Sequence, residues 1–164
     1  MTEFPISDAI YHKKTRIRVC GLLESDGSIL LIKHDRIGPD GFLWSPPGGG
    51  VEFGYSVEQT LIKEFKEETN LDIEIQSFLF VNEYIDVKHH AIELFFTVKF
   101  LSGFLKLGSD PEIPANEQIL SEIRFIDYNE LKLMKKTTVH NCFGLLKHPR
   151  DVFELRGFFK FENI

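Results

Sequence analysis

Two apolar runs near the start of the chain predict a pair of β-strands. Residues 16–23 are largely apolar apart from Arg16 and Arg18, and residues 29–32 form a second apolar run. Asp26 and Gly27 lie between the two runs, and an Asp-Gly pair readily adopts the positive φ angles of a two-residue hairpin turn. The pattern therefore predicts a β-hairpin.

Residues 38–50 have the composition of a long loop. The segment contains three prolines and five glycines, and it ends in the run Gly48-Gly49-Gly50. Proline cannot donate a backbone hydrogen bond, and the conformational freedom of glycine disfavours regular structure. We therefore expect neither a helix nor a regular strand in this segment.

The clearest helix covers residues 56–70. Ser56 and Gln59 have the spacing of a capping box, in which two side chains satisfy free backbone N–H groups at the start of a helix. The interior consists of good helix formers, and Asn70 tolerates the left-handed conformation that closes many helices. Start, interior and end therefore all indicate the same element.

Later segments predict more strands and several short helices. We expect strands at residues 71–82, 91–101 and 123–126, a short helix after Tyr128, a helix at 142–147 and a closing segment at 153–161. With 164 residues, 43% of them hydrophobic, the chain can form one well-packed core. We therefore expect a single domain over residues 1–164, of the α/β (α+β) class, with a mixed β-sheet between helices.

Charge and cysteine content limit the kinds of binding partner and the cellular compartment that we expect. The formal net charge is −6 and no basic stripe is present, so we expect no nucleic-acid partner. No export signal is recognisable, and no segment has the roughly 20 apolar residues of a membrane helix. Cys20 and Cys142 lack the paired spacing of a zinc site, so we expect reduced, buried thiols in a cytoplasmic protein. A homodimer stays an open alternative.

Three glutamates of the predicted helix share one face. Glu64, Glu67 and Glu68 occupy positions i, i+3 and i+4, so their carboxylates converge. Glu68 also falls between Val57 and Leu61 in the apolar arc of the helix, where a carboxylate needs a partner. A solvated acidic face is the ordinary explanation for such a helix. The preceding glycine run favours a cation site instead, because it lets backbone carbonyls approach closely and hard oxygen ligands select Mg²⁺ or Mn²⁺.

The stretch from Gly49 to Leu71, GGVEFGYSVEQTLIKEFKEETNL, resembles the Nudix box. The box has the pattern G-x5-E-x7-R-E-U-x-E-E-x-G-U, in which U is an aliphatic residue. Gly49 matches the leading glycine, the three glutamates match the acidic positions, and Leu71 matches the closing aliphatic position. The order of elements is similar to that of the family over most of the chain, from Arg16 to Leu131.

Four positions depart from the box. Tyr55 replaces a glutamate, Lys63 an arginine, Phe65 an aliphatic residue and Asn70 a glycine. Asn70 can still adopt the left-handed cap, and Phe65 keeps a core role. Lys63 keeps the positive charge but lacks the planar fork of arginine. Lys63 lies four residues before Glu67, near enough for a helical ion pair that can orient the Glu67 carboxylate.

The resemblance implies an α/β/α sandwich and a hydrolase that acts on a small nucleotide substrate. It implies Mg²⁺, with Mn²⁺ as a substitute, and a site formed by Gly48, Gly49, Lys63, Glu64, Glu67 and Glu68, with a glycine carbonyl among the metal ligands. The implied reaction is attack of water on a phosphorus of a nucleoside diphosphate linked to another group, such as ADP-ribose or a nucleotide sugar. The alternatives are a nucleoside triphosphate pyrophosphohydrolase and a non-catalytic nucleotide-sensing module.

Further candidates for substrate contacts are Arg16, Arg18, Trp44, Glu93, Glu117 and Glu122. The two arginines alternate along one strand and so share a face that suits a diphosphate or a nucleobase edge. Trp44 is able to stack on a base. Glu93 interrupts an apolar strand, where a carboxylate needs a reason, whereas glutamates in loops are usually solvated.

Overall fold

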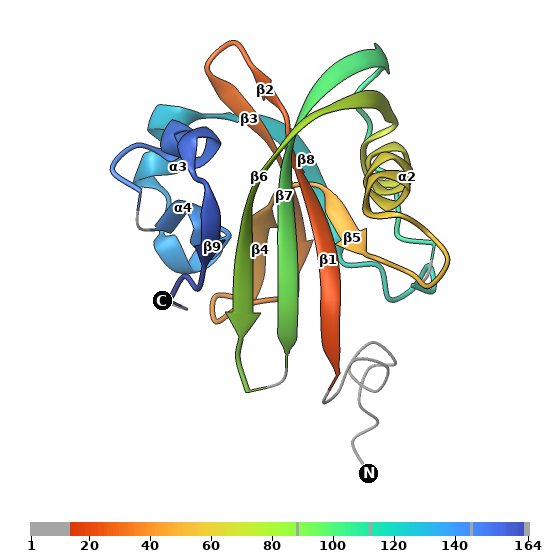
Figure 1. The fold of residues 1–164 in the computed structure, drawn as a ribbon, viewed down its shortest axis with the longest axis horizontal. Coiled ribbons are helices and arrows are strands. Elements are labelled where there is room, and N and C mark those ends of the chain that lie inside the picture. The colour runs from red at the N-terminus through yellow and green to blue at the C-terminus, as the bar shows by residue number, and fades with distance from the viewer. Residues whose placement is uncertain (1–13, 88, 112, 145, 163–164) are drawn as a thin grey trace.

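The computed structural model describes residues 14–87, 89–111, 113–144 and 146–162. It is a mixed α+β structure in which two β-sheets pack against each other and helices flank them (Figure 1). The first sheet has the strand order β5-β1-β7-β6-β9, and in the second sheet β3 pairs with β2, β4 and β8. The first sheet contains both parallel and antiparallel pairs, so the expected mixed sheet is confirmed.

The elements have the following bounds. The first sheet consists of β1 (Thr15–Leu22), β5 (Gly48–Gly50), β6 (Leu71–Ile85), β7 (His90–Gly103) and β9 (Gly157–Phe159). The second consists of β2 (Glu24–Ser25), β3 (Ser28–Asp35), β4 (Phe42–Ser45) and β8 (Leu120–Asp127). The helices are α2 (Val57–Thr69), α3 (Tyr128–Leu133), α4 (Asn141–Gly144) and the 3₁₀ helices η1 (Lys136–Thr138) and η2 (Pro149–Glu154).

Two groups of buried side chains hold these layers together. In the group that joins the two sheets, Phe80 and Phe95 stack with their ring centroids 4.4 Å apart. In the second group, Leu61 and Phe65 of α2 pack with Val19 of β1. α2 therefore covers one flank of the sandwich, while α3 and α4 lie on the other (Figure 1).

The predicted turn at Asp26-Gly27 is confirmed, but its strands differ from the prediction. Both residues have positive φ angles, 47° and 76°, and they join the two-residue strand β2 to β3. The longer strand β1 pairs instead with β5 and, in parallel, with β7. The chain passes from one sheet to the other after β1, a change that a local apolar pattern does not reveal.

The prediction that residues 38–50 contain no regular strand is wrong. β4 pairs with β3, and the glycines of β5 pair antiparallel with Arg18, Val19 and Cys20 of β1. A Cβ atom at Gly48 would collide with the backbone of Val19, so the absence of a side chain permits this pairing. Composition alone treated the glycine run as a loop because the partner strand lies far away in sequence.

The predicted helix at 56–70 is confirmed as α2 with its caps. Ser56 accepts a hydrogen bond from the backbone of Gln59 at 3.1 Å, and Gln59 accepts one from the backbone of Ser56 at 2.9 Å. Asn70 has a φ of 61° and closes the helix in the left-handed conformation. These local signals place the glutamates of the helix directly after β5.

The later elements follow the predicted order. β6, β7, β8 and α3 are present, whereas the helix expected at 142–147 is the shorter α4. The closing segment adds β9 in parallel to β6, and Phe159 and Phe161 stack with centroids 5.1 Å apart. This segment completes the first sheet at its β6 edge.

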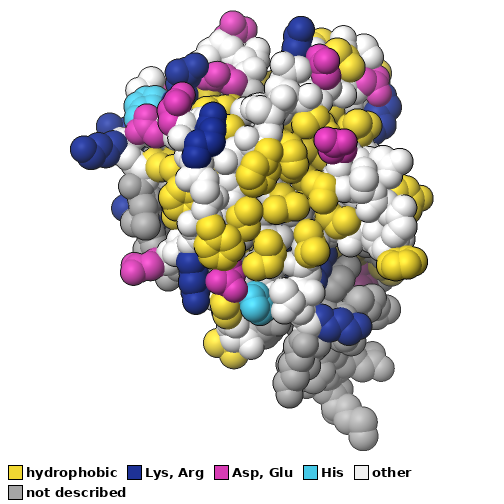
Figure 2. Space-filling model, viewed as in Figure 1, with side chains coloured by type: hydrophobic (Ala, Val, Ile, Leu, Met, Phe, Trp, Pro, Cys, Tyr) yellow, Lys and Arg dark blue, Asp and Glu magenta, His cyan; other side chains and the backbone are white. Residues whose placement is uncertain are grey.

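The face of the first sheet that α2 leaves uncovered carries many hydrophobic side chains (Figure 2). Exposed hydrophobic residues on its strands include Ile17, Phe78 and Phe158, which are 51%, 47% and 64% exposed. A homodimer stays a prediction. Across the described ranges, no helix has the length and apolar character needed to cross a bilayer.

Candidate active site

Glu68 is the most deeply buried glutamate of the box. Its side chain accepts a hydrogen bond at 3.0 Å from the backbone N–H of Gly48. Burial raises the pKa of the Glu68 carboxyl to about 8; the Gly48 hydrogen bond opposes this effect, and the charge of Glu64 adds to it. The expectation that this carboxylate needs a partner is thus met by the glycine strand.

The carboxylate of Glu64 lies against Gly49. A Cβ atom at position 49 would collide with the carboxyl group of Glu64, so the close approach requires glycine. β5 therefore meets two glutamates of α2, Glu68 through a backbone hydrogen bond and Glu64 through direct contact. A role for a glycine carbonyl as metal ligand stays a prediction.

Glu67 is half-buried and borders the segment that follows β7. Gly108 in this segment donates its N–H to the carbonyl of Glu68 at 2.9 Å, and a Cβ there would collide with the carbonyl of Glu67. Besides burial, the charge of Asp110 contributes to the raised pKa of Glu68. Asp110 is thus an acidic neighbour that the sequence did not reveal, because only the fold returns this segment to α2.

The glutamates of the box have the chemistry of a divalent-cation site, but their three side chains do not converge on one point. Within the described ranges, no three His, Cys, Asp or Glu side chains lie close enough together to share a metal ion. Carboxylates are the ligands that Mg²⁺ and Mn²⁺ prefer, and Glu64 and Glu68 already approach the same glycine strand. Metal binding by the three glutamates stays a prediction.

Lys63 forms its ion pair with Glu52, while Glu67, the partner considered from the helical spacing, acts on Lys63 only through its charge. Lys63 Nζ lies 3.0 Å from Glu52 Oε1, and this contact raises the pKa of Lys63. Tyr55 donates its backbone N–H to the carbonyl of Glu52 at 3.2 Å, and the Lys63 ammonium lies 5.8 Å from the Tyr55 ring centroid. The match to the pattern of the Nudix box did not indicate Glu52, because this carboxylate lies three positions before the position of the glutamate in the pattern.

Arg16 and Arg18 extend from β1 next to the glycine strand. The guanidinium of Arg16 lies beside Gly50, and Arg18 is aligned with Glu93 on the neighbouring strand β7. Burial would lower the pKa of Arg18, but the acidic groups around it, which include Glu93 and Glu68, raise it above its usual value. Acidic groups of the box and Glu93 of β7 therefore both act on the charge of Arg18.

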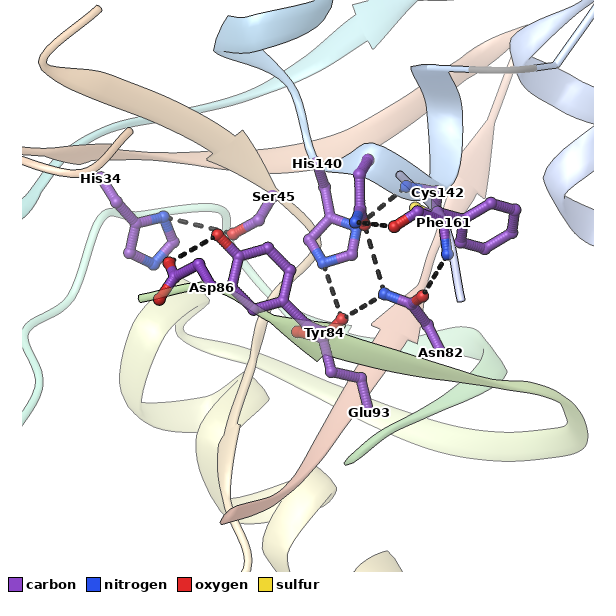
Figure 3. Close-up of polar contacts among 10 residues, drawn as sticks. His34, Ser45, Asn82, Tyr84, Asp86, Glu93, His140, Cys142 and Phe161 are labelled. Atoms are coloured by element: carbon purple, nitrogen blue, oxygen red, sulfur yellow. Dashed lines mark hydrogen bonds and ion pairs between the residues drawn. The ribbon is translucent and has the colours of Figure 1, made fainter. Parts of the chain in front are cut away.

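Glu93 belongs to a buried polar cluster between the sheets (Figure 3). Its Oε2 accepts hydrogen bonds from Asn82 Nδ2 at 2.8 Å and His140 Nε2 at 3.0 Å. Asn82 also accepts the backbone N–H of Phe161 at 3.2 Å, which ties the closing segment to the cluster. Burial alone would raise the pKa of Glu93, but His140, Arg18 and Asn82 lower it below its usual value. The sequence signalled Glu93, but not its partners.

His34 is a second buried histidine that the sequence did not single out. Its Nδ1 lies 3.3 Å from Ser45 Oγ (Figure 3). The carbonyl oxygen of Ile32 lies 3.2 Å from the same nitrogen. Burial lowers the pKa of His34 to about 4, and the charge of Arg18 contributes in the same direction. His34 is therefore neutral at pH 7.

Three sequence candidates make contacts elsewhere. Trp44 is only 4% exposed, and the guanidinium of Arg124 lies 5.2 Å from its ring centroid. Glu122 pairs with Arg124 at 3.2 Å, and the backbone carbonyl of Glu117 accepts a hydrogen bond from Arg36. None of these contacts joins Trp44, Glu117 or Glu122 to the glutamates of the box.

An open, largely apolar cavity of about 610 Å³ is formed by other residues. Its lining includes Leu22, Val98, Phe100, Leu105 and Phe125, and it contains none of the three glutamates of the box. This cavity is therefore separate from the candidate site, which consists of the carboxylates and the glycine strand.

Comparisons with known proteins identify the family of the chain. The model of the NUDIX domain family matches residues 12–143. An ADP-ribose pyrophosphatase of Methanocaldococcus jannaschii is 35% identical over 117 residues, which cover 70% of this chain. The chain spans only 63% of the length of that protein. The nucleoside triphosphatase NudI of Escherichia coli is 29% identical over 153 residues, or 88% of this chain and 98% of NudI.

Solved structures show the same fold. A MutT protein from Methanosarcina mazei superposes with a TM-score of 0.63 at 22% sequence identity, over 87% of this chain and 92% of that one. The fold and the carboxylate-bearing helix define a Nudix-type domain. With the family match over most of its length, the chain belongs to the NUDIX domain family.

Proposed function

We propose that the protein is a divalent-metal-dependent hydrolase that cleaves a phosphoanhydride bond in a nucleoside diphosphate linked to another group, with ADP-ribose or a nucleotide sugar as substrate. One observation carries the proposal: Glu64 and Glu68 both meet the glycine strand β5, one by contact with Gly49 and the other by a hydrogen bond from Gly48. Partly buried carboxylates that lie close together are unfavourable without a counter-charge, and their oxygens suit a divalent cation.

The residues have distinct roles in this proposal. Glu64, Glu67 and Glu68 hold Mg²⁺, or Mn²⁺ in its place, with a carbonyl of Gly48 or Gly49. When bound, the ion neutralises phosphate oxygens and lowers the pKa of a coordinated water. Lys63 holds the helix against the preceding turn through Glu52. The proposal also includes a single domain over residues 1–164 and a cytoplasmic location.

A nucleoside triphosphate is the second candidate substrate. The similarity to NudI, which extends over 98% of that protein, favours it, whereas the higher identity to the M. jannaschii ADP-ribose pyrophosphatase favours the first candidate. A module that only senses nucleotides has less need of three carboxylates at the glycine strand.

A substrate screen tests the proposal. Purified protein is incubated with Mg²⁺, Mn²⁺ or excess chelator and with ADP-ribose, nucleotide sugars and nucleoside triphosphates, and the products are identified. We expect metal-dependent release of a nucleoside monophosphate from the diphosphate compounds. Glu68→Gln should abolish this activity, while Glu58→Gln, an exposed position in the first turn of α2, should retain it. Full activity with chelator, or no hydrolysis of any of these compounds, contradicts the proposal.

A further inference from the structure

Arg18 carries a buried donor that the described part of the protein leaves unsatisfied. Its Nε atom is buried and has no hydrogen-bond partner among the residues that the structure describes. The side chain as a whole is only half-buried, so it is not sealed inside the core. Buried donors without acceptors are unfavourable, and each one calls for a ligand, a water molecule or a functional reason.

Two carboxylates that attract Arg18 accept hydrogen bonds from other donors. Glu93 Oε2 accepts hydrogen bonds from Asn82 and His140, at 2.8 and 3.0 Å. Glu68 Oε2 accepts its hydrogen bond from the backbone of Gly48 at 3.0 Å. The charges of both carboxylates nevertheless act on Arg18 and favour its protonated form. The described surroundings therefore favour a positive charge on Arg18 and leave its Nε–H without an acceptor.

We propose that Arg18 is a phosphate-binding residue, which offers its guanidinium fork to oxygens of the diphosphate beside Glu64 and Glu68. The inference rests on the proposed function, because it takes its ligand class from the phosphoanhydride substrate. The planar fork of arginine matches two oxygens of one phosphate group. In a protein with a net charge of −6, such a fixed cation next to the carboxylates supplies the attraction that a polyphosphate needs.

Calorimetric titration with ADP and with inorganic pyrophosphate, both in excess chelator, isolates this contribution from that of any metal. The variant Arg18→Lys keeps the charge next to Glu68 and Glu93 but loses the fork. We expect it to bind both ligands more weakly by roughly tenfold or more, as for loss of a charge-assisted bidentate contact. Arg150→Lys is the matched control, because Arg150 already donates to Glu24 at 2.7 Å; its affinities should equal those of the wild type.

A second measurement uses the wild-type protein and so does not depend on the folding of a variant. Phenylglyoxal modifies accessible guanidinium groups, and mass spectrometry of peptides locates the product. We expect ADP and pyrophosphate to protect Arg18 from modification and to leave Arg150 unprotected.

The outcomes separate this inference from the proposed function. Equal affinity of Arg18→Lys and wild type, absence of binding by the wild type, or lack of protection at Arg18 would overturn it. Weaker binding of ADP but not of pyrophosphate would also overturn it, because the contact would then involve the nucleoside. If no compound in the screen is hydrolysed while binding still depends on Arg18, the hydrolase proposal fails and the phosphate-binding role stands.

Discussion

Lys63 and Glu52 join the helix of the box to the turn before it, with Lys63 Nζ 3.0 Å from Glu52 Oε1. Lys63 directly precedes Glu64 on α2, and Glu52 lies two residues after the end of β5. The pair therefore spans the two elements that carry the proposed metal ligands. A matched pair is present on the same helix: Lys66 Nζ lies 2.9 Å from an oxygen of Asp72 in β6.

A double-mutant cycle with Glu52→Gln and Lys63→Met should show coupling in metal dependence. Both side chains are partly exposed, so we expect a coupling of about 0.3–1 kcal/mol in stability. We also expect a severalfold higher metal concentration for half-maximal activity, because the helix is no longer held against the turn. The control cycle of Lys66→Met with Asp72→Asn should show similar coupling in stability and unchanged metal dependence. Equal metal effects in both cycles would contradict a positioning role.

Glu68→Gln should stabilise the metal-free protein at pH 8. The pKa of Glu68 rises from 4.5 to about 8 on folding, so the folded state binds more protons between these values and stability falls as pH increases through them. Glutamine removes the charge, and the gain at pH 8 is at most about 5 kcal/mol. Urea unfolding in chelator at pH 5 and pH 8 measures it. A gain that is equal at both values would show that burial of charge is not its cause.

His34 should make the protein less stable in mild acid. Its pKa falls from 6.5 to about 4 on folding, so the unfolded state binds more protons between these values and stability declines as pH falls through them. At pH 5 the loss relative to pH 7 is about 2 kcal/mol from this group. In urea unfolding curves, His34→Gln should remove that part of the decline. A variant with the same pH profile as the wild type would refute the assignment.

Gly49→Ala should impair the metal site with little change to the rest of the fold. The new Cβ would collide with the Glu64 carboxyl group, and such overpacking typically costs about 1–3 kcal/mol. We expect at least tenfold lower activity at limiting metal. Gly50→Ala is a milder neighbour, because its Cβ meets the flexible end of Arg16 at 3.0 Å. Equal activity of the two variants would exclude a special requirement at position 49.

The sequence predicted those parts of the fold that depend on local signals. The capping residues Ser56 and Gln59 and the left-handed Asn70 lie within or next to α2, so the helix and the spacing of its glutamates were readable. Strand β5 could not be predicted in this way. A glycine run becomes a strand only through its pairing with Arg18–Cys20, and only the tertiary fold brings those residues beside it. Local composition contains no information on that partner.

Local sequence signals likewise indicated only part of the candidate site. Glu93 was noticeable as a charge in an apolar strand, but its partner His140 is 47 residues away in sequence and follows the short 3₁₀ helix η1. Glu52 lies within the box at a position that the pattern leaves unspecified, so only the distance to Lys63 reveals its role. Pairings of this kind depend on tertiary contacts that one sequence does not display.

Strand β9 lies parallel to β6, and Phe161 donates its backbone N–H to Asn82 at 3.2 Å. A nascent chain leaves the ribosome with its N-terminus first, so Asn82 and Glu93 emerge well before residues 157–161. The nascent protein can pair β1, β7 and β6 at that stage. The side of the polar cluster around Glu93 that β9 and Phe161 later cover is then still exposed to water. Closure of the sheet edge is therefore a late event in biosynthesis, and a stalled ribosome would hold a molecule whose buried charge still has water as a neighbour.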